Sequence, residues 1–185
     1  MNGLAMAYGD LWDFHPTHWI VVPVNCGWNK RGLAIMGTGV ALDAAKRFPY
    51  LRKVWGQYCQ EAAAATYRRD RVDVIAGCLV RFDTASRCIL FPTKPLDVAK
   101  PSFSWRLPAA LLLIEQSAGT LAALRGTPLR DGSRVDRVAL PLVGCGAGGL
   151  QRHEVLPILR RELDDNFTLV EQPASSSSKI VKEWG

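Results

Sequence analysis

The stretch Val21–Pro49, VVPVNCGWNKRGLAIMGTGVALDAAKRFP, decides how the rest of the chain is arranged. It begins inside an apolar, β-branched run from Trp19 to Val24, which predicts a buried strand that ends at the polar Asn25. A glycine-rich loop follows, and Val40–Arg47 then has a helical pattern that Pro49 stops. A strand, a glycine loop and a helix in this order direct backbone N–H groups and a helix N-terminus at an anion, usually a phosphate.

A second glycine loop, VGCGAGGL at Val143–Leu150, has the same setting. The apolar run Val138–Val143 comes before it and a helical pattern comes after it. Two such loops in one small domain suggest a ligand that carries two adjacent phosphates.

The composition is that of one globular domain with a full core. The chain has 185 residues, of which 48% are hydrophobic and 22% charged. No apolar run approaches the roughly 20 residues that span a bilayer, and the N-terminus does not resemble a signal peptide. The five cysteines are an odd number without Cys-x-x-Cys spacing, and the histidines show no metal-ligand spacing. We therefore expect a cytoplasmic monomer with free thiols and no metal site.

The net charge of +6 suits a polyanionic partner, but solvated surface charge with a few phosphate ligands is the favoured explanation. The densest basic run, Arg68-Arg69-Asp70-Arg71, has no interleaved aromatic residues. Charge therefore permits a nucleic-acid substrate without indicating one.

Apolar periodicity predicts the remaining elements. Expected strands are Leu4–Tyr8, Cys78–Phe82, Cys88–Phe91 (ended by Pro92-Thr93-Lys94-Pro95), Val135–Val143 and Phe167–Val170; expected helices are Tyr50–Thr66, Trp105–Leu124 and Arg152–Leu163; Leu96–Phe103 is expected to be a loop. Strands that alternate with helices predict an α/β domain with a largely parallel or mixed sheet covered on both faces. We assign residues 1–172 to this domain and 173–185 to a flexible C-terminal tail.

Three polar or glycine-rich sites, at Asn25, Lys94 and Gly144, each follow a predicted strand. Ligands of α/β sheets bind outside the carboxyl ends of the strands. We therefore expect these three sites to converge on one rim of the sheet.

The motifs at these positions resemble those of the macrodomain family, in the branch that contains DarG and terminal ADP-ribose glycohydrolase. They are Asn25 with Met36–Leu42 and Lys46–Pro49, then Phe91–Lys94 with Ser104–Arg106, and finally Leu140–Leu150. The resemblance runs from about Gly9 to Val170 and implies a three-layer α/β/α fold with a mixed sheet. It also implies ADP-ribose as ligand or product, and no cofactor.

The activity that the resemblance implies is hydrolytic removal of mono-ADP-ribose from a macromolecule. The attachment point could be a DNA base. No membrane partner is expected. Lys94 would act at the anomeric carbon or capture the ring-opened aldehyde, and Asn25 would hold the distal ribose. Asp10 would accept a hydrogen bond from the adenine amino group. The full set of ligand-binding residues expected besides Asn25 and Lys94 is Asp10, Leu11, Met36, Gly37, Thr38, Gly39, Val40, Thr93, Val143, Gly144, Cys145, Gly146, Ala147, Gly148, Gly149 and Leu150.

The chain departs from this branch in three places. One is Gln151-Arg152 after the second glycine loop, where acidic and aromatic residues are expected. The segment Gly27–Leu33 is longer than expected, and its Trp28, Lys30 and Arg31 are either solvated or able to cover the distal ribose. The second glycine loop has Ala147-Gly148 where terminal ADP-ribose glycohydrolase has an aspartate. This departure resembles DarG and argues against an aspartate-assisted step.

Simpler roles remain open for each singled-out residue. Lys94 could only balance phosphate charge, Asn25 could cap a turn, and Asp10 could cap a helix. Trp105-Arg106 is expected mainly to anchor its helix, with contact between Arg106 and the site left open, and Cys145 is expected to be a small packing residue. The alternative functions are a non-catalytic ADP-ribose reader, an ADP-ribose 1″-phosphate phosphatase and, least favoured, a plain nucleic-acid-binding protein.

Overall fold

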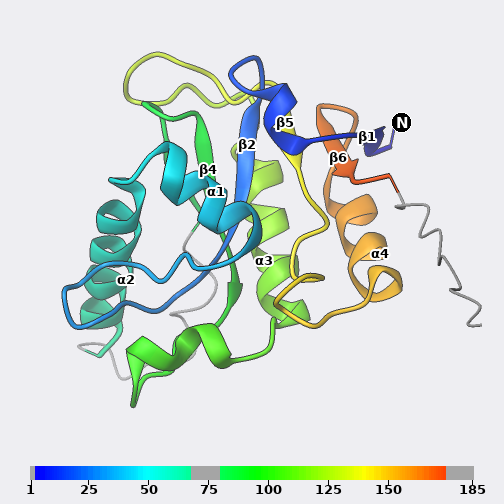
Figure 1. Cartoon of the computed structure of the whole chain (residues 1–185). Helices are drawn as coiled ribbons and strands as arrows, with labels where there is room; N and C mark the ends of the chain where they lie inside the picture. The colour runs from blue at the N-terminus through cyan, green and yellow to red at the C-terminus, as the bar shows by residue number, and fades with distance from the viewer. Residues whose placement is uncertain (1–2, 68–79, 174–185) are drawn as a thin grey trace, which may run out of the picture.

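The computed structural model describes residues 3–67 and 80–173 (Figure 1). Its strands are β1 (Ala5–Tyr8), β2 (Trp19–Asn25), β3 (Arg81–Asp83), β4 (Cys88–Lys94), β5 (Val138–Leu140) and β6 (Phe167–Glu171). Its α-helices are α1 (Gly39–Arg47), α2 (Leu51–Tyr67), α3 (Leu111–Ala123) and α4 (Arg152–Glu162), and its 3₁₀ helices are η1 (Leu11–Phe14) and η3 (Pro101–Arg106). Residues 174–185 of the predicted tail 173–185, and the basic run at 68–71, lie outside the described residues.

The six strands form one sheet in the order β1-β6-β5-β2-β4-β3. Every neighbouring pair is parallel except β3 with β4, which form an antiparallel hairpin. The expectation of a mixed sheet is therefore confirmed. Residues 78–79 of the predicted strand Cys78–Phe82 are outside the described part. Parallel strands require both faces of a sheet to be covered, because their crossover helices lie on those faces.

Two apolar cores confirm the three layers. One core joins the sheet to α3 and α4 through residues such as Phe91, Ile114 and Leu159. The other joins the opposite face to η1, α1 and α2 through Val22, Leu51 and other side chains. Figure 1 shows α1 and α2 on one side of the strands, and α3 and α4 on the other.

The predicted end of the strand at Phe91 is wrong, because β4 continues through Pro92 to Lys94. Proline removes a backbone donor and is tolerated in a sheet only where that donor is not needed. Pro92 lies beyond the end of β3, whose pairing with β4 stops at Leu90. The carboxyl end of β4 therefore extends further toward the rim than the sequence predicted.

The predicted helix Trp105–Leu124 is also wrong in its first third. Residues 101–106, partly expected to be loop, form η3, and the chain then runs extended to the start of α3 at Leu111. Pro108 disfavours the helical conformation of the residue before it, and Leu107 is indeed extended. The extended segment is held by hydrogen bonds from the Ala109 N–H to the Gly148 oxygen and from the Ala110 N–H to the Thr93 oxygen.

The predicted strand Val135–Val143 is shortened at both ends, because only Val138–Leu140 pairs with neighbours. Pro141 follows directly, and the chain then turns into the second glycine loop. The helix that follows, α4, begins with a capping box between Gln151 and Glu154.

The long segment Gly27–Leu33 is an ordered loop that packs on α2. Asn29 organises it, because its Oδ1 accepts the N–H groups of Arg31 and Leu33. The loop lies so close to α2 that a Cβ atom on Gly56 would collide with the Gly32 carbonyl oxygen. The loop therefore forms part of the fold and fixes the chain that enters the first glycine loop.

Within the described parts of the chain, no helix combines the length and the apolar character that crossing a membrane requires.

Candidate functional site

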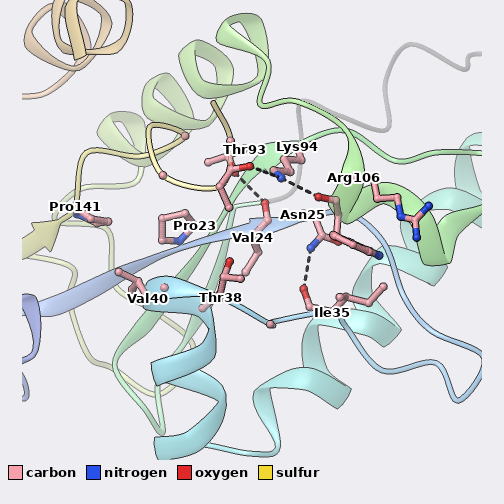
Figure 2. Close-up of a pocket in the computed structure, with 18 of the residues that line it drawn as sticks. Pro23, Val24, Asn25, Ile35, Thr38, Val40, Thr93, Lys94, Arg106 and Pro141 are labelled. Atoms are coloured by element: carbon pink, nitrogen blue, oxygen red, sulfur yellow. Dashed lines mark hydrogen bonds between the residues drawn. The ribbon is translucent and has the colours of Figure 1, made fainter. Parts of the chain in front are cut away.

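A cavity of about 730 Å³ opens at the carboxyl ends of β2, β4 and β5. Asn25 and Lys94 are the last residues of their strands and lie opposite each other in the β2–β4 register. A shift in register after Val24 leaves Thr93 without a Cα partner on β2, although its Oγ1 donates to the Val24 carbonyl oxygen. Asn25 and Lys94 both line the cavity. The two glycine loops close the cavity, so the sites that the sequence placed at strand ends do meet at one rim (Figure 2).

The first glycine loop presents unpaired backbone donors to this cavity. Residues 37–41, which include the start of α1, all line it. The first N–H groups of a helix have no partner within the helix. Among the described residues, none accepts a hydrogen bond from the N–H groups of residues 37–41. Five donors and the positive end of the helix dipole are thus available to an anion.

The second glycine loop faces the first one across the cavity. The N–H groups of Gly146, Ala147 and Gly148 likewise have no acceptor in the described parts of the chain. Gly148 is confined, because a Cβ atom there would collide with the Gly144 carbonyl oxygen and with Ala109. Gly144 has a φ of 76°, a left-handed conformation that favours glycine. The glycines therefore allow this loop to fold compactly beside the cavity that it lines.

The Lys94 amine is held between η3 and the second glycine loop. Its Nζ donates to the carbonyl oxygens of Trp105 and Ala147, each at 2.8 Å (Figure 2). Partial burial lowers the pKa of Lys94 below its ordinary value. A neutral amine has two N–H groups and one lone pair. With both N–H groups donated to these carbonyls, the lone pair of the neutral form stays free to attack an electrophile.

Asn25 has a structural role in addition to its place at the cavity. Its Nδ2 donates to the Ile35 carbonyl oxygen at 2.8 Å, and its Oδ1 accepts the Gly27 N–H at 3.0 Å. The side chain thereby joins the two ends of the loop between β2 and the first glycine loop. An amide has two donor hydrogens and two acceptor lone pairs, so one of each remains for a ligand.

The cavity is electrostatically one-sided. Of the described residues that line it, only Lys94 and Arg106 carry charge, and both are cationic. Cations and free N–H groups without a carboxylate favour an anionic ligand. The apolar part of the cavity wall is formed by residues such as Val24, Ile35 and Leu142.

The structure brings most of the predicted site residues to this cavity but not all of them. Those that line it are Asn25, Gly37, Thr38, Gly39, Val40, Thr93, Lys94, Gly144, Gly146, Ala147 and Gly148. The ones that do not are Asp10, Leu11, Met36, Val143, Cys145, Gly149 and Leu150, of which Leu11, Met36 and Val143 are buried in the core. Trp28, Lys30 and Arg31 of the long loop do not line it either.

Asp10 is placed beside a separate, smaller hollow of about 380 Å³ with Trp12, Asp43, Lys46 and Arg47. Its Oδ1 accepts the Trp12 N–H at 2.9 Å and caps η1. This is the simpler role that the sequence left open. Contact between Asp10 and adenine stays a prediction.

Cys145 is half-buried, and burial raises the pKa of its thiol. A raised pKa reduces the thiolate fraction, and the residue does not line the cavity. These observations support a packing role.

Several lining residues were missed by sequence reasoning. They are Pro23, Val24, Ile35, Ala41, Trp105, Pro141 and Leu142. Pro23, Val24, Pro141 and Leu142 flank predicted strand ends, which is a signal that could have found them. Trp105 was assigned to a helix anchor because the 3₁₀ helix was not foreseen. Arg106, for which contact with the site was left open, does line the cavity.

No protein-family model and no curated protein matches the sequence, whereas solved structures do match the fold. The macrodomain of Thermus aquaticus DarG is 26% identical, with 92% of this chain and 98% of that chain covered and a TM-score of 0.59. The macrodomain of Mycobacterium tuberculosis DarG is 24% identical, with 91% and 98% covered and a TM-score of 0.57.

Thermosipho africanus DarTG, solved in complex with ADP-ribose, is 19% identical, with 93% of this chain covered and a TM-score of 0.62. The present chain spans only 43% of that longer chain. The protein has the macrodomain fold, as the motifs at the rim predicted. Within that fold its similarity is to the DarG branch.

Proposed function

We propose that the protein binds ADP-ribose and hydrolytically removes mono-ADP-ribose from a macromolecular acceptor. The observation that carries this proposal is the pair of facing loops. In the described parts of the chain, their N–H groups are unpaired and line one cavity together with two cations and no carboxylate. A diphosphate has charge and oxygen atoms for both loops at once. The Thermosipho africanus structure, of the same fold, contains ADP-ribose and supports this choice of ligand.

In the proposed reaction Lys94 is the nucleophile. Its neutral amine attacks the anomeric carbon of the distal ribose, and the bond from that carbon to the acceptor breaks. The acceptor leaves with the bonding electron pair and takes up a proton, while the amine loses one. Water then attacks the same carbon, breaks the bond to Nζ and releases ADP-ribose with the lysine restored. The reaction needs no cofactor.

Asn25 is proposed to position the ribose for this attack. It lies opposite Lys94 in register, lines the cavity and keeps one donor and one acceptor free. A positioned ribose converts the attack into an effectively unimolecular step.

Turnover assays with two acceptors test this function. The protein is incubated with an ADP-ribosylated single-stranded oligonucleotide and, separately, with an ADP-ribosylated protein, and released ADP-ribose is measured. Release from one of them supports the hydrolase, and the acceptor that is cleaved identifies the substrate class. Calorimetric binding of ADP-ribose without release from either substrate would instead establish a reader. A phosphatase would release phosphate from ADP-ribose 1″-phosphate.

A further inference from the structure

Strand β4 contains one extra residue immediately before Lys94. In the register with β2, Val24 pairs with Pro92. The next residue of β2, Asn25, pairs with Lys94, so Thr93 has no Cα partner. An extra residue of this kind is a β-bulge, a feature that re-aims side chains and is common beside active sites.

The bulge bears on the direction of the Lys94 side chain, because side chains of a strand alternate between the two faces of the sheet. Leu90 lies in the core with α1 and α2, and Phe91 lies in the core with α3 and α4. Strict alternation would therefore direct Lys94 to the side of α1 and α2. Its Nζ instead donates to the oxygens of Trp105 and Ala147, in the segments that lead into α3 and α4.

Two buried hydroxyl groups bond the backbone at the bulge. Thr93 is buried, and its Oγ1 donates to the Val24 carbonyl oxygen at 3.3 Å (Figure 2). Ser117 of α3 is fully buried, and its Oγ donates to the Pro92 carbonyl oxygen at 3.2 Å. Val24 and Pro92 are the last pair before the register shifts, so each member of that pair accepts one of the hydroxyls.

Ser117 is a polar residue on the apolar side of α3. Its neighbours on the helix, Ile114, Ala118 and Leu121, all lie in the core. A buried hydroxyl costs free energy unless it is hydrogen-bonded, and a helical serine can bond the carbonyl four residues before it. Here the hydroxyl bonds β4 instead, at the residue before the bulge.

Backbone donors fix the two residues that follow Pro92. The Thr93 oxygen accepts the Ala110 N–H at 3.0 Å, and the Lys94 oxygen accepts the Cys26 N–H at 3.1 Å. Three consecutive carbonyl groups of β4 are thus bonded from α3, from the segment before α3 and from the chain after β2.

We propose that Thr93 and Ser117 are positioning residues, whose hydroxyls hold the bulge and thereby keep the Lys94 amine between its two carbonyl acceptors. Ser117 does not line the cavity, so it acts on the site only through β4. The expected effect on turnover rests on the proposed function, whereas the state of the amine can be measured without a substrate.

The reactivity of the Lys94 amine tests the inference directly. Acetic anhydride acylates the neutral form of an amine, so the pH dependence of labelling at Lys94, read by peptide mass spectrometry, reports its pKa. Partial burial lowers that pKa in the unmodified protein. In Ser117→Ala and Thr93→Val the amine should lose this burial, and the labelling midpoint should rise toward the ordinary lysine value. Arg106, the other charged residue among the described ones that line the cavity, is unchanged in both variants.

Turnover gives a second measurement. We expect Ser117→Ala to lower it about tenfold or more, because a misplacement of about 1 Å at a reacting group can cost about a hundredfold. The affinity for ADP-ribose should not change, since Ser117 does not line the cavity. Thr93→Ser keeps the hydroxyl and should retain most of the activity, whereas Thr93→Val keeps the shape, loses the hydroxyl and should not.

Ser86 provides a matched control near the opposite end of β4. It is buried, and its Oγ donates to the Asp83 Oδ2 at 2.6 Å. Ser86→Ala removes a buried hydroxyl and its hydrogen bond, as Ser117→Ala does, so urea unfolding should show a loss of stability in both variants. Only Ser117→Ala should move the labelling midpoint of Lys94.

A midpoint that does not rise in Ser117→Ala and Thr93→Val overturns the inference, and so does an equal rise in Ser86→Ala. Failure of the proposed function gives a different result. If the unmodified protein releases no ADP-ribose from either acceptor while the midpoint still rises in both variants, the hydrolase is refuted and the positioning role stands. If ADP-ribose is released, and Ser117→Ala has the same rate and midpoint as the unmodified protein, the hydrolase stands and the positioning role is refuted.

Discussion

The Nζ of Lys94 and the carbonyl oxygen of Ala147 are 2.8 Å apart and joined by a hydrogen bond. This bond ties the end of β4 to the second glycine loop, so the proposed nucleophile and the proposed diphosphate site share one contact. A ligand that moves the loop therefore also changes how the amine is held. The second bond, to the Trp105 oxygen, connects the same amine to η3.

Substitutions of Lys94 should distinguish a catalytic role of its amine from a role of its positive charge in ligand binding. Lys94→Ala and Lys94→Arg are both expected to lower turnover by about two to four orders of magnitude, because neither supplies a neutral amine. Arginine keeps a positive charge in the cavity and should retain more of the ADP-ribose affinity. Single-turnover release and calorimetry measure the two effects. Full activity of Lys94→Arg would show that the lysine acts only through its charge.

The turnover rate should rise with pH if neutral Lys94 is the reacting form. Burial lowers the pKa of this lysine, so the midpoint of the rise should lie below the ordinary lysine value. At pH values well below that midpoint the ammonium form predominates and turnover is slow. A pH–rate profile under single-turnover conditions measures the midpoint. A flat profile, or a rate that falls with pH, contradicts the lysine mechanism.

Two glycines of the second loop should respond differently to alanine. In Gly148→Ala the new Cβ collides with the Gly144 oxygen and Ala109, and we expect a loss of about 1–3 kcal/mol in the free energy of unfolding. In Gly146→Ala the Cβ meets open space, so the stability should stay within about 0.5 kcal/mol. The same Cβ lies at the cavity wall and should weaken ADP-ribose binding.

Denaturant unfolding and calorimetry distinguish these two outcomes. A Gly146→Ala variant that binds ADP-ribose as tightly as the unmodified protein would place the diphosphate away from this loop.

Asn25 and Asn29 offer a matched pair of substitutions. Asn25→Asp removes the donor to the Ile35 oxygen and sets a carboxylate against that carbonyl, which should cost about 1–3 kcal/mol of stability. Among the residues that the structure describes, the Asn29 side chain bonds only through Oδ1, to the Arg31 and Leu33 N–H groups, so Asn29→Asp keeps both bonds and should be nearly neutral. Urea unfolding measures both. Equal stabilities would show that Asn25 does not hold the loop.

Features that depend on local sequence signals could be predicted. The strand that ends at Asn25 and the helix after Gly39 follow from a β-branched run, glycines and Pro49. Their convergence with Lys94 follows from the rule that parallel strands direct their carboxyl ends to one edge. The donors of the first glycine loop could be predicted for the same reason, since a helix N-terminus always leaves them unpaired.

Features that depend on tertiary contacts could not be predicted. The segment from Trp105 to Ala110 has a helical apolar pattern, but bonds to Gly148 and Thr93 hold its end extended. Asp10 has the sequence position of a ligand residue, yet its carboxylate caps η1. The packing of the long loop on α2 has no local sequence signal either. Glycine at position 56 of the helix is explained only by the Gly32 carbonyl oxygen, which leaves no room for a Cβ atom there.

Gly56 also has a consequence for how this protein and its relatives can change over evolution. Glycine inside a helix costs about 1 kcal/mol relative to alanine, and here that cost allows a backbone carbonyl of the loop to lie against α2. Relatives that keep the long loop should therefore keep glycine at this helix position. Relatives with a short loop should be free to place alanine there. The pairing of loop length with one residue of α2 would trace the inheritance of this loop through sequences alone.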